Sequence, residues 1–382
     1  MQLKQQIGIR SSMAPGFTFF YSSLLTGLYI LVAANASRGN FLCPFDSLYQ
    51  FGDSISDTGN LIRVPGVGPT LPAARFPYGQ TIGRPTGRWS DGLLIIDFTA
   101  MDLHLPLLNP YLDRNASFNN GVNFAVAGST ALDFVFFTAR GIVVPIVTSP
   151  LGVQVNSFKQ YLSSICSSPT ECSTKLRQSL FWVGEIGGND INYAFTQGKS
   201  LQEIRTYIPS ITQAIINNTR QIIQLGAKRI VVPGNFPLGC IPVALNFVSN
   251  ASSLEFDEFG CSRSFNDLAR YQNSYLQTAL NSLRKEFPDA VIVYADFYGS
   301  FRSVLTRARF LGFDAGSLLQ ACCGIGGPYN YDMNRACGSP GVPVCPNPRR
   351  FIHWDGLHLT QEAYRRISEF LIPDILSRIQ CF

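Results

Sequence analysis

Short apolar, β-branched runs alternate with longer segments of helical periodicity, and this alternation restricts the fold more than any other feature of the chain. The expected strands cover 48–51, 180–183, 229–232 and 290–294. The expected helices cover 91–103, 153–165, 201–225, 265–287 and 361–372, and Pro209 should kink or divide the third of them. Continuous apolar strands joined by helices are typical of a parallel sheet buried on both faces. We therefore expect one α/β domain, a three-layer α/β/α sandwich with a central, mainly parallel sheet.

The composition indicates a folded protein with a large core. Of the 382 residues, 46% are hydrophobic and only 14% are charged, which excludes intrinsic disorder. The formal net charge of +5 comes from basic residues scattered singly or in pairs, without a basic stripe that carries aromatics. A nucleic-acid partner is therefore not expected.

The N-terminal segment has the order of a secretory signal. The first 45 residues contain three basic and no acidic residues, and an apolar run over 17–34 ends in Ala34-Asn35-Ala36. We expect a signal peptide over 1–36, started at Met1 or Met13, and a single mature domain over 37–382. A signal anchor is the alternative, because the run reaches the roughly 17 residues of a short bilayer span. Polar and small residues within the run favour cleavage. After cleavage we expect no stable membrane association, and export through the secretory pathway to the apoplast or vacuole.

All ten cysteines follow residue 36, and disulfides are their usual role in an oxidising compartment. A zinc site is the alternative for one cluster, Cys322, Cys323, Cys337 and Cys345. Adjacent cysteines do not match a zinc spacer and no histidine lies at ligand spacing, so we expect no metal. Export would also expose three glycosylation sequons, which begin at Asn115, Asn217 and Asn250.

Two short motifs at opposite ends of the chain could supply a serine nucleophile and its base. Ser54 follows the first expected strand in Gly52-Asp53-Ser54, where the glycine permits a sharp turn and a helix is expected to begin. Asp355 precedes His358 by three residues just before the last expected helix, so its carboxylate could hold Nδ1–H and leave Nε2 free. Taken alone, the first motif would more simply be a helix cap.

The choice of base is narrow because the chain has only three histidines. His104 lies between apolar residues without a suitably spaced acid, and we interpret it as structural. His353 is the stronger rival, since it lies two residues from Asp355, but it lacks the glycine-containing turn of His358.

Two glycine-containing loops could donate hydrogen bonds to a developing oxyanion. One is 121–129, in which Gly128 could present its backbone N–H without a side chain in the way. The other is 187–190, in which Asn189 could donate through Nδ2. Each loop alone would more simply be a turn.

Together, Gly-Asp-Ser, the Gly128 loop, Gly-Gly-Asn-Asp and Asp-x-x-His occur in an order that resembles the plant GDSL esterase/lipase family of the SGNH hydrolase superfamily. The resemblance spans about 45–372 and includes Phe76-Pro77-Tyr78-Gly79 and the block 84–92. It implies a flavodoxin-like SGNH fold, a catalytic triad of Ser54, His358 and Asp355, and no cofactor. It also implies an oxyanion hole formed by Ser54, Gly128 and Asn189. Ile55 stands where the family name has leucine, and no G-x-S-x-G elbow of an α/β-hydrolase is present.

Three further runs, 43–46, 322–331 and 344–348, are similar to the branch of this family that contains acetylajmalan esterase. That branch deacetylates alkaloids. The resemblance implies a carboxylic ester hydrolase that removes a small acyl group, such as acetyl, from a small-molecule plant metabolite. Two alternatives remain open: an acyltransferase that passes the same acyl group from Ser54 to an alcohol, and a secreted binding or defence protein with a vestigial site.

Overall fold

The computed structural model describes residues 45–144, 149–248 and 255–379. The expected signal peptide, Cys43, Cys381 and the sequon at Asn250 lie outside these residues. Among the described helices, none combines the length and hydropathy needed to cross a bilayer.

Five parallel strands form one sheet, in the order β2-β1-β3-β4-β5. Their bounds are β1 Ser47–Phe51, β2 Gly121–Asn123, β3 Ser179–Val183, β4 Arg229–Pro233 and β5 Val291–Ala295. Four of them match the predicted strands within one or two residues, whereas the three-residue β2 was not predicted as a strand. The predicted parallel sheet is confirmed, and the strand order is that of the flavodoxin-like doubly wound sheet. Such sheets bind ligands at the carboxyl ends of the strands beside the switch point, here between β1 and β3.

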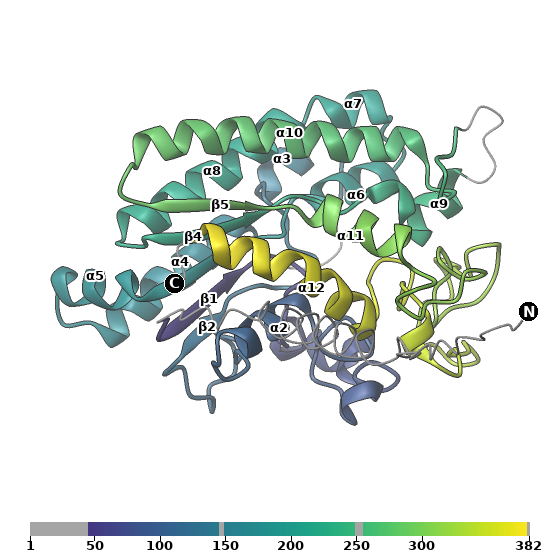
Figure 1. Cartoon of the computed structure of the whole chain (residues 1–382), viewed down its shortest axis with the longest axis horizontal. Coiled ribbons are helices and arrows are strands. Elements are labelled where there is room, and N and C mark those ends of the chain that lie inside the picture. Colours follow the sequence, from purple (N-terminus) through teal and green to yellow (C-terminus); the bar gives the residue numbers. More distant parts are fainter. Residues whose placement is uncertain (1–44, 145–148, 249–254, 380–382) are drawn as a thin grey trace, which may run out of the picture. The chain divides into compact units, whose positions relative to one another are not determined.

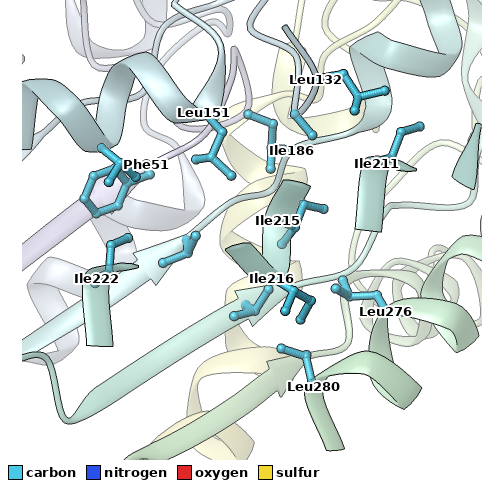
Figure 2. Close-up of a cluster of buried hydrophobic side chains, with 14 of the residues drawn as sticks. Phe51, Leu132, Leu151, Ile186, Ile211, Ile215, Ile216, Ile222, Leu276 and Leu280 are labelled. Atoms are coloured by element: carbon cyan, nitrogen blue, oxygen red, sulfur yellow. The ribbon is translucent and has the colours of Figure 1, made fainter. Parts of the chain in front are cut away.

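Side chains alternate between the two faces of the sheet and enter two separate cores. In β3, Phe181 and Val183 belong to one core, and Leu180 and Trp182 belong to the other. The first core lies beneath helices α4, α8 and α10, and Figure 2 shows part of it. The second lies beneath α2, α11 and α12, so helices cover both faces of the sheet (Figure 1). The predicted three-layer sandwich is confirmed.

Most of the predicted helices are present, with some changed bounds. The long ones among them are α2 Ile95–Asp102, α4 Leu151–Ile165, α8 Ile208–Gln224, α10 Arg263–Glu286 and α12 Gln361–Arg378, whereas α11 Phe297–Thr306 was not predicted. Pro209 lies in the first turn of α8 and separates it from α7 Leu201–Arg205, as predicted. The helix expected from residue 91 begins later, because the Asp97 carboxylate accepts the Leu94 N–H and caps α2 there.

Shorter helices join these elements and were not predicted. They are α3 Phe134–Thr138, α5 Pro169–Arg177, α6 Gly188–Thr196 and α9 Pro242–Val248. Single 3-10 turns occur at Leu61–Arg63, Gly68–Thr70, Pro72–Ala74, Gln80–Ile82, Leu238–Cys240 and Pro348–Arg350. Of all these, α6 and α9 matter most for function, because both contribute to the pocket described below.

Eight cysteines form four disulfides: Cys166–Cys172, Cys240–Cys261, Cys322–Cys345 and Cys323–Cys337. The predicted use of cysteine in disulfides is confirmed for these eight. The zinc alternative for the cluster of four is wrong, since all four sulfurs are paired. Two of the disulfides, Cys322–Cys345 and Cys323–Cys337, cross-link the loop that leads to Asp355 and His358.

Candidate active site

The turn after β1 presents Ser54 at the carboxyl edge of the sheet. Gly52 has φ +152°, and a Cβ there would come within 2.8 Å of the Glu185 carbonyl oxygen, so only glycine fits. The backbone N–H groups of Ser56 and Asp57 donate to the Asp53 carbonyl at 3.1 and 2.9 Å, which forms a single turn.

The prediction of a helix directly after Ser54 is therefore wrong, because the chain forms only this one turn and does not continue as a helix. The Asp57 carboxylate accepts the N–H groups of Gly59, Asn60 and Leu61 and redirects the chain into a short 3-10 turn. The Ser54 side chain is nevertheless placed as predicted, at the end of the strand.

Ser54, His358 and Asp355 form one buried, hydrogen-bonded chain. His358 Nε2 lies 2.8 Å from Ser54 Oγ, and His358 Nδ1 lies 2.9 Å from Asp355 Oδ2. Asp355 Oδ1 also accepts the backbone N–H groups of Leu357 and His358, both at 2.7 Å. Burial alone would raise the pKa of Asp355. The His358 charge and these hydrogen bonds outweigh burial, so that the pKa of Asp355 lies below its usual value. Asp355 is thus an anion that fixes the orientation of the imidazole.

Aromatic side chains enclose this hydrogen-bonded chain, and the sequence did not single them out for this role. The Tyr78 hydroxyl donates to Asp355 Oδ2 at 2.8 Å. The Trp89 ring lies 5.3 Å from the His358 ring, and Tyr78 packs edge-on against both Trp89 and Trp354. Tyr78 and Trp89 come from the blocks 76–79 and 84–92, so the family resemblance contained a signal for them.

The other two histidines lie away from Ser54. His353 is fully buried beside Phe301, and neither ring nitrogen has a hydrogen-bond partner among the described residues. Burial lowers the pKa of His353 to about 3, so its ring is neutral. His104 is exposed after α2 with φ +56°. Of the three, only His358 contacts Ser54.

Both candidate oxyanion loops converge on the carboxyl ends of β1 and β3. Asn189, in the first turn of α6, donates through Nδ2 to Asp53 Oδ2 at 3.0 Å and to the Ser129 carbonyl at 2.9 Å. Gly128 precedes that carbonyl in the chain and has φ +78°. The Asn189–Asp53 contact was not anticipated from the sequence, and it means that both amide hydrogens have acceptors.

Three buried carboxyl groups, those of Asp53, Glu185 and Asp190, lie at this edge of the sheet. Burial raises the pKa of Asp53 to about 7, and burial also raises that of Asp190 to about 7. Burial, followed by the charge of Asp53, raises the pKa of Glu185 well above its usual value. These groups therefore hold protons at a pH where exposed carboxyls are ionised.

This cluster predicts that the protein is more stable at mildly acidic pH. Unfolded carboxyls titrate near pH 4, so between about 4 and 7 the folded state binds more protons than the unfolded state. The stabilisation is present below the unfolded pKa and is lost as pH rises through the folded pKa. Tm should therefore be higher at about pH 6 than at about pH 8. The buried His353 has the opposite effect on stability, but most of that effect falls below pH 6, because its pKa is about 3 in the folded state and about 6.5 in the unfolded state. Asp190→Asn should reduce the difference, and equal Tm values in the wild type would contradict the prediction.

A small pocket, with a cavity volume of about 60 Å³, opens beside Ser54. Its polar lining is Asp53, Ser54, Glu185, Asn189, Asn192, Asn235 and His358. Its apolar walls come mainly from the chain after β4 and from α9: Phe236, Leu238, Ile241, Val243 and Ala244. No group of three or more His, Cys, Asp or Glu suited to a metal occurs among the described residues. The pocket combines apolar walls with a serine that is hydrogen-bonded to a histidine.

Comparison with known proteins identifies the family of the chain. The sequence matches the GDSL-like Lipase/Acylhydrolase family over residues 48–371. Acetylajmalan esterase of Rauvolfia serpentina is 56% identical over 353 residues, 92% of this chain and 91% of that protein. Acetylajmalan esterase 2 of the same plant is 57% identical over 354 residues, 92% of this chain and 96% of the relative.

A more distant relative is GDSL esterase/lipase At5g03980 of Arabidopsis thaliana, which is 46% identical over 341 residues, 89% of this chain and 92% of that protein. Family, fold and relatives agree, as the sequence resemblance predicted. The chain therefore belongs to the GDSL-like lipase/acylhydrolase family and is a carboxylic ester hydrolase that acts on small-molecule esters.

Proposed function

We propose that the protein hydrolyses its ester through an acyl-enzyme on Ser54, with His358 as general base and Asp355 as the group that orients it. The observation that carries this proposal is the buried chain of contacts from Asp355 through His358 to Ser54. It has the nucleophile, base and orienting carboxylate that acyl transfer requires.

In the first half of the reaction, His358 Nε2 takes the proton of Ser54 Oγ as Oγ attacks the ester carbonyl carbon. When the tetrahedral intermediate collapses, His358 returns this proton to the departing alcohol oxygen. In the second half, His358 deprotonates a water that attacks the acyl carbon, and Ser54 recovers its proton as the acid leaves. Asp355 stays ionised throughout and stabilises the imidazolium.

The backbone N–H groups of Ser54 and Gly128 and the Asn189 amide are the proposed oxyanion donors. Preorganised donors of this kind are worth about 3–4 kcal/mol each in the transition state. Asn189 already points one amide hydrogen at Asp53 Oδ2. Burial keeps the pKa of Asp53 near 7, so that a protonated Asp53 competes weakly with an oxyanion for this hydrogen.

For the substrate, we propose an acetyl ester of an alkaloid. The relatives named acetylajmalan esterase support this choice, because they share more than half of their residues with this chain over nearly its whole length. The pocket's apolar walls suit contact with the carbon skeleton of such an ester.

The test is hydrolysis of an acetylated alkaloid compared with its propionyl and butyryl esters, with and without a large alcohol as acceptor. The proposal predicts that free acetate is the main product and that rates fall as the acyl chain lengthens. Transfer of acetyl mainly to the added alcohol would instead identify an acyltransferase. Absence of turnover of any of these esters would contradict the proposed substrate.

Tyr78→Phe is expected to lower kcat about tenfold, or ~1.4 kcal/mol, with little change in KM. The substitution removes the hydroxyl that donates to Asp355 Oδ2 and keeps the ring between Trp89 and Trp354. Steady-state kinetics on an acetyl ester measure the effect. Tyr331→Phe is the matched control, because the Tyr331 ring packs beside Gly356, the residue that follows Asp355. An equal loss in both variants, or a change in KM alone, would argue against a role for Tyr78 in holding Asp355.

We also propose that the protein enters the secretory pathway by a signal peptide over 1–36 and is glycosylated. The disulfides support an oxidising compartment. Asn115 and Asn217, which begin two of the sequons, are exposed. Peptide mapping of the plant-expressed protein, with and without glycosidase, tests both positions and the mature N-terminus.

A further inference from the structure

Glu185 lines the pocket beside Ser54, yet the acyl-transfer mechanism does not use it. It follows β3 in the loop that leads to α6, and only 3% of its surface is exposed. The Gly188 N–H donates to its carboxylate, but Oε1 has no hydrogen-bond partner among the described residues. Buried polar atoms nearly always have partners, so an unpaired carboxylate oxygen in a substrate pocket requires an explanation.

The electrostatic character of the pocket indicates which kind of group could pair with Glu185. Two acidic side chains, Asp53 and Glu185, contribute to the lining, and His358 is the one basic side chain among the described lining residues. No lysine or arginine is among them, so no fixed positive charge opposes a cation beside Glu185 once its carboxyl group ionises.

We propose that Glu185 binds the positively charged nitrogen of the substrate, so that the site selects esters whose alcohol portion carries an ammonium group. This inference rests on the proposed ester hydrolysis and narrows its substrate class. The positive charge of the nitrogen would pair with the ionised Glu185 carboxylate, and the apolar walls would contact the carbon frame around the nitrogen.

The carboxyl group must lose its proton to form this ion pair, which makes the selection dependent on pH. The titratable groups around Glu185 are Asp53, Asp190 and Tyr364, and none of them brings positive charge. Burial and the charge of Asp53 hold the pKa of Glu185 well above its usual value, so the free pocket keeps it protonated at low pH. As pH rises, a larger fraction of Glu185 is ionised, and the preference for a positively charged ester over an uncharged one should increase.

The experiment compares two acetyl esters of nearly the same shape: acetylcholine, and its uncharged analogue in which tert-butyl replaces trimethylammonium. Neither ester titrates, so the ratio of their kcat/KM values cancels the pH dependence of the chemical step. For the wild type, we expect this ratio to rise about tenfold between about pH 6 and about pH 9. Nitrophenyl acetate serves as the independent reporter of ester hydrolysis.

Glu185→Gln keeps the shape of the side chain and an oxygen that can accept the Gly188 N–H, but it removes the ionisable group. In this variant the ratio should be lower than in the wild type and should rise less with pH, while hydrolysis of the uncharged ester continues. Glu255→Gln, at an exposed position, is the control and should behave as the wild type.

The possible outcomes separate this inference from the proposed function. A wild-type ratio that stays constant with pH, or a wild type that hydrolyses nitrophenyl acetate but not acetylcholine, overturns the role of Glu185. A Glu185→Gln variant that keeps the wild-type ratio also overturns it. Failure of the wild type to hydrolyse any of the three esters overturns the proposed ester hydrolysis itself. If the Glu185→Gln variant does not fold, a wild-type ratio that is constant with pH still overturns the inference.

Discussion

Ser54→Ala is expected to lower kcat/KM for an acetyl ester by about 10⁴-fold or more, with no loss of folded structure. The substitution removes the oxygen that would form the acyl bond, and Ser54 Oγ makes its hydrogen bond to His358 rather than to the scaffold. Steady-state kinetics, with circular dichroism as the check on folding, measure the effect.

His358→Ala should reduce activity by a similar factor, and the double variant should lose little more, because the two residues act as one unit. His104→Ala is the matched control, since His104 is exposed and away from Ser54, and it should leave activity unchanged. A Ser54→Ala variant with a tenth of the wild-type activity would contradict the proposed nucleophile, because catalysis would then depend on another group.

The largest effect on stability is expected for Arg88→Met. Arg88 makes two hydrogen bonds to the Asp97 carboxylate, at 2.6 and 2.8 Å, and both side chains are buried. Without Arg88, the buried carboxylate loses its counter-charge while it still caps α2 through the Leu94 N–H. Breaking a buried pair on one side typically costs about 3–5 kcal/mol, which urea unfolding would measure as a loss in the free energy of unfolding.

A second bidentate pair supplies the control for this prediction. Arg220 also makes two hydrogen bonds to one carboxylate, that of Glu286, but on the surface of the molecule. Arg220→Met should therefore destabilise the protein far less than Arg88→Met, since solvent replaces the lost contact. Equal losses in the two variants would show that burial does not determine the energy of the Arg88–Asp97 pair.

The main lines of the fold could be predicted from the sequence because the strands and long helices carry their patterns locally. Strands β1, β3, β4 and β5 are apolar runs long enough to recognise, and Pro209 marked the start of α8. By contrast, β2 has only three residues, and its strand character depends on pairing with β1. No local pattern could reveal it.

The same distinction explains what could be predicted of the candidate site. The Asp355–His358 contact spans three residues, so spacing was sufficient to predict it. The family resemblance brought Ser54 and Asn189 to the same site, but not the hydrogen bond from Asn189 to Asp53, 136 residues away. Tyr78 lies 277 residues from Asp355 along the chain, and Glu185 differs from an ordinary loop residue only in its burial. These features depend on how distant segments pack, which a single sequence does not display.

The most direct test of the account is mass spectrometry of the intact protein, quenched soon after mixing with an activated acetyl ester. The account predicts one added acetyl group, located on the peptide that contains Ser54 and lost again as free acetate accumulates. The adduct should be absent from Ser54→Ala. Turnover of the ester without any adduct, or an acetyl group that persists in Ser54→Ala and is still released, would contradict the acyl-enzyme mechanism at Ser54.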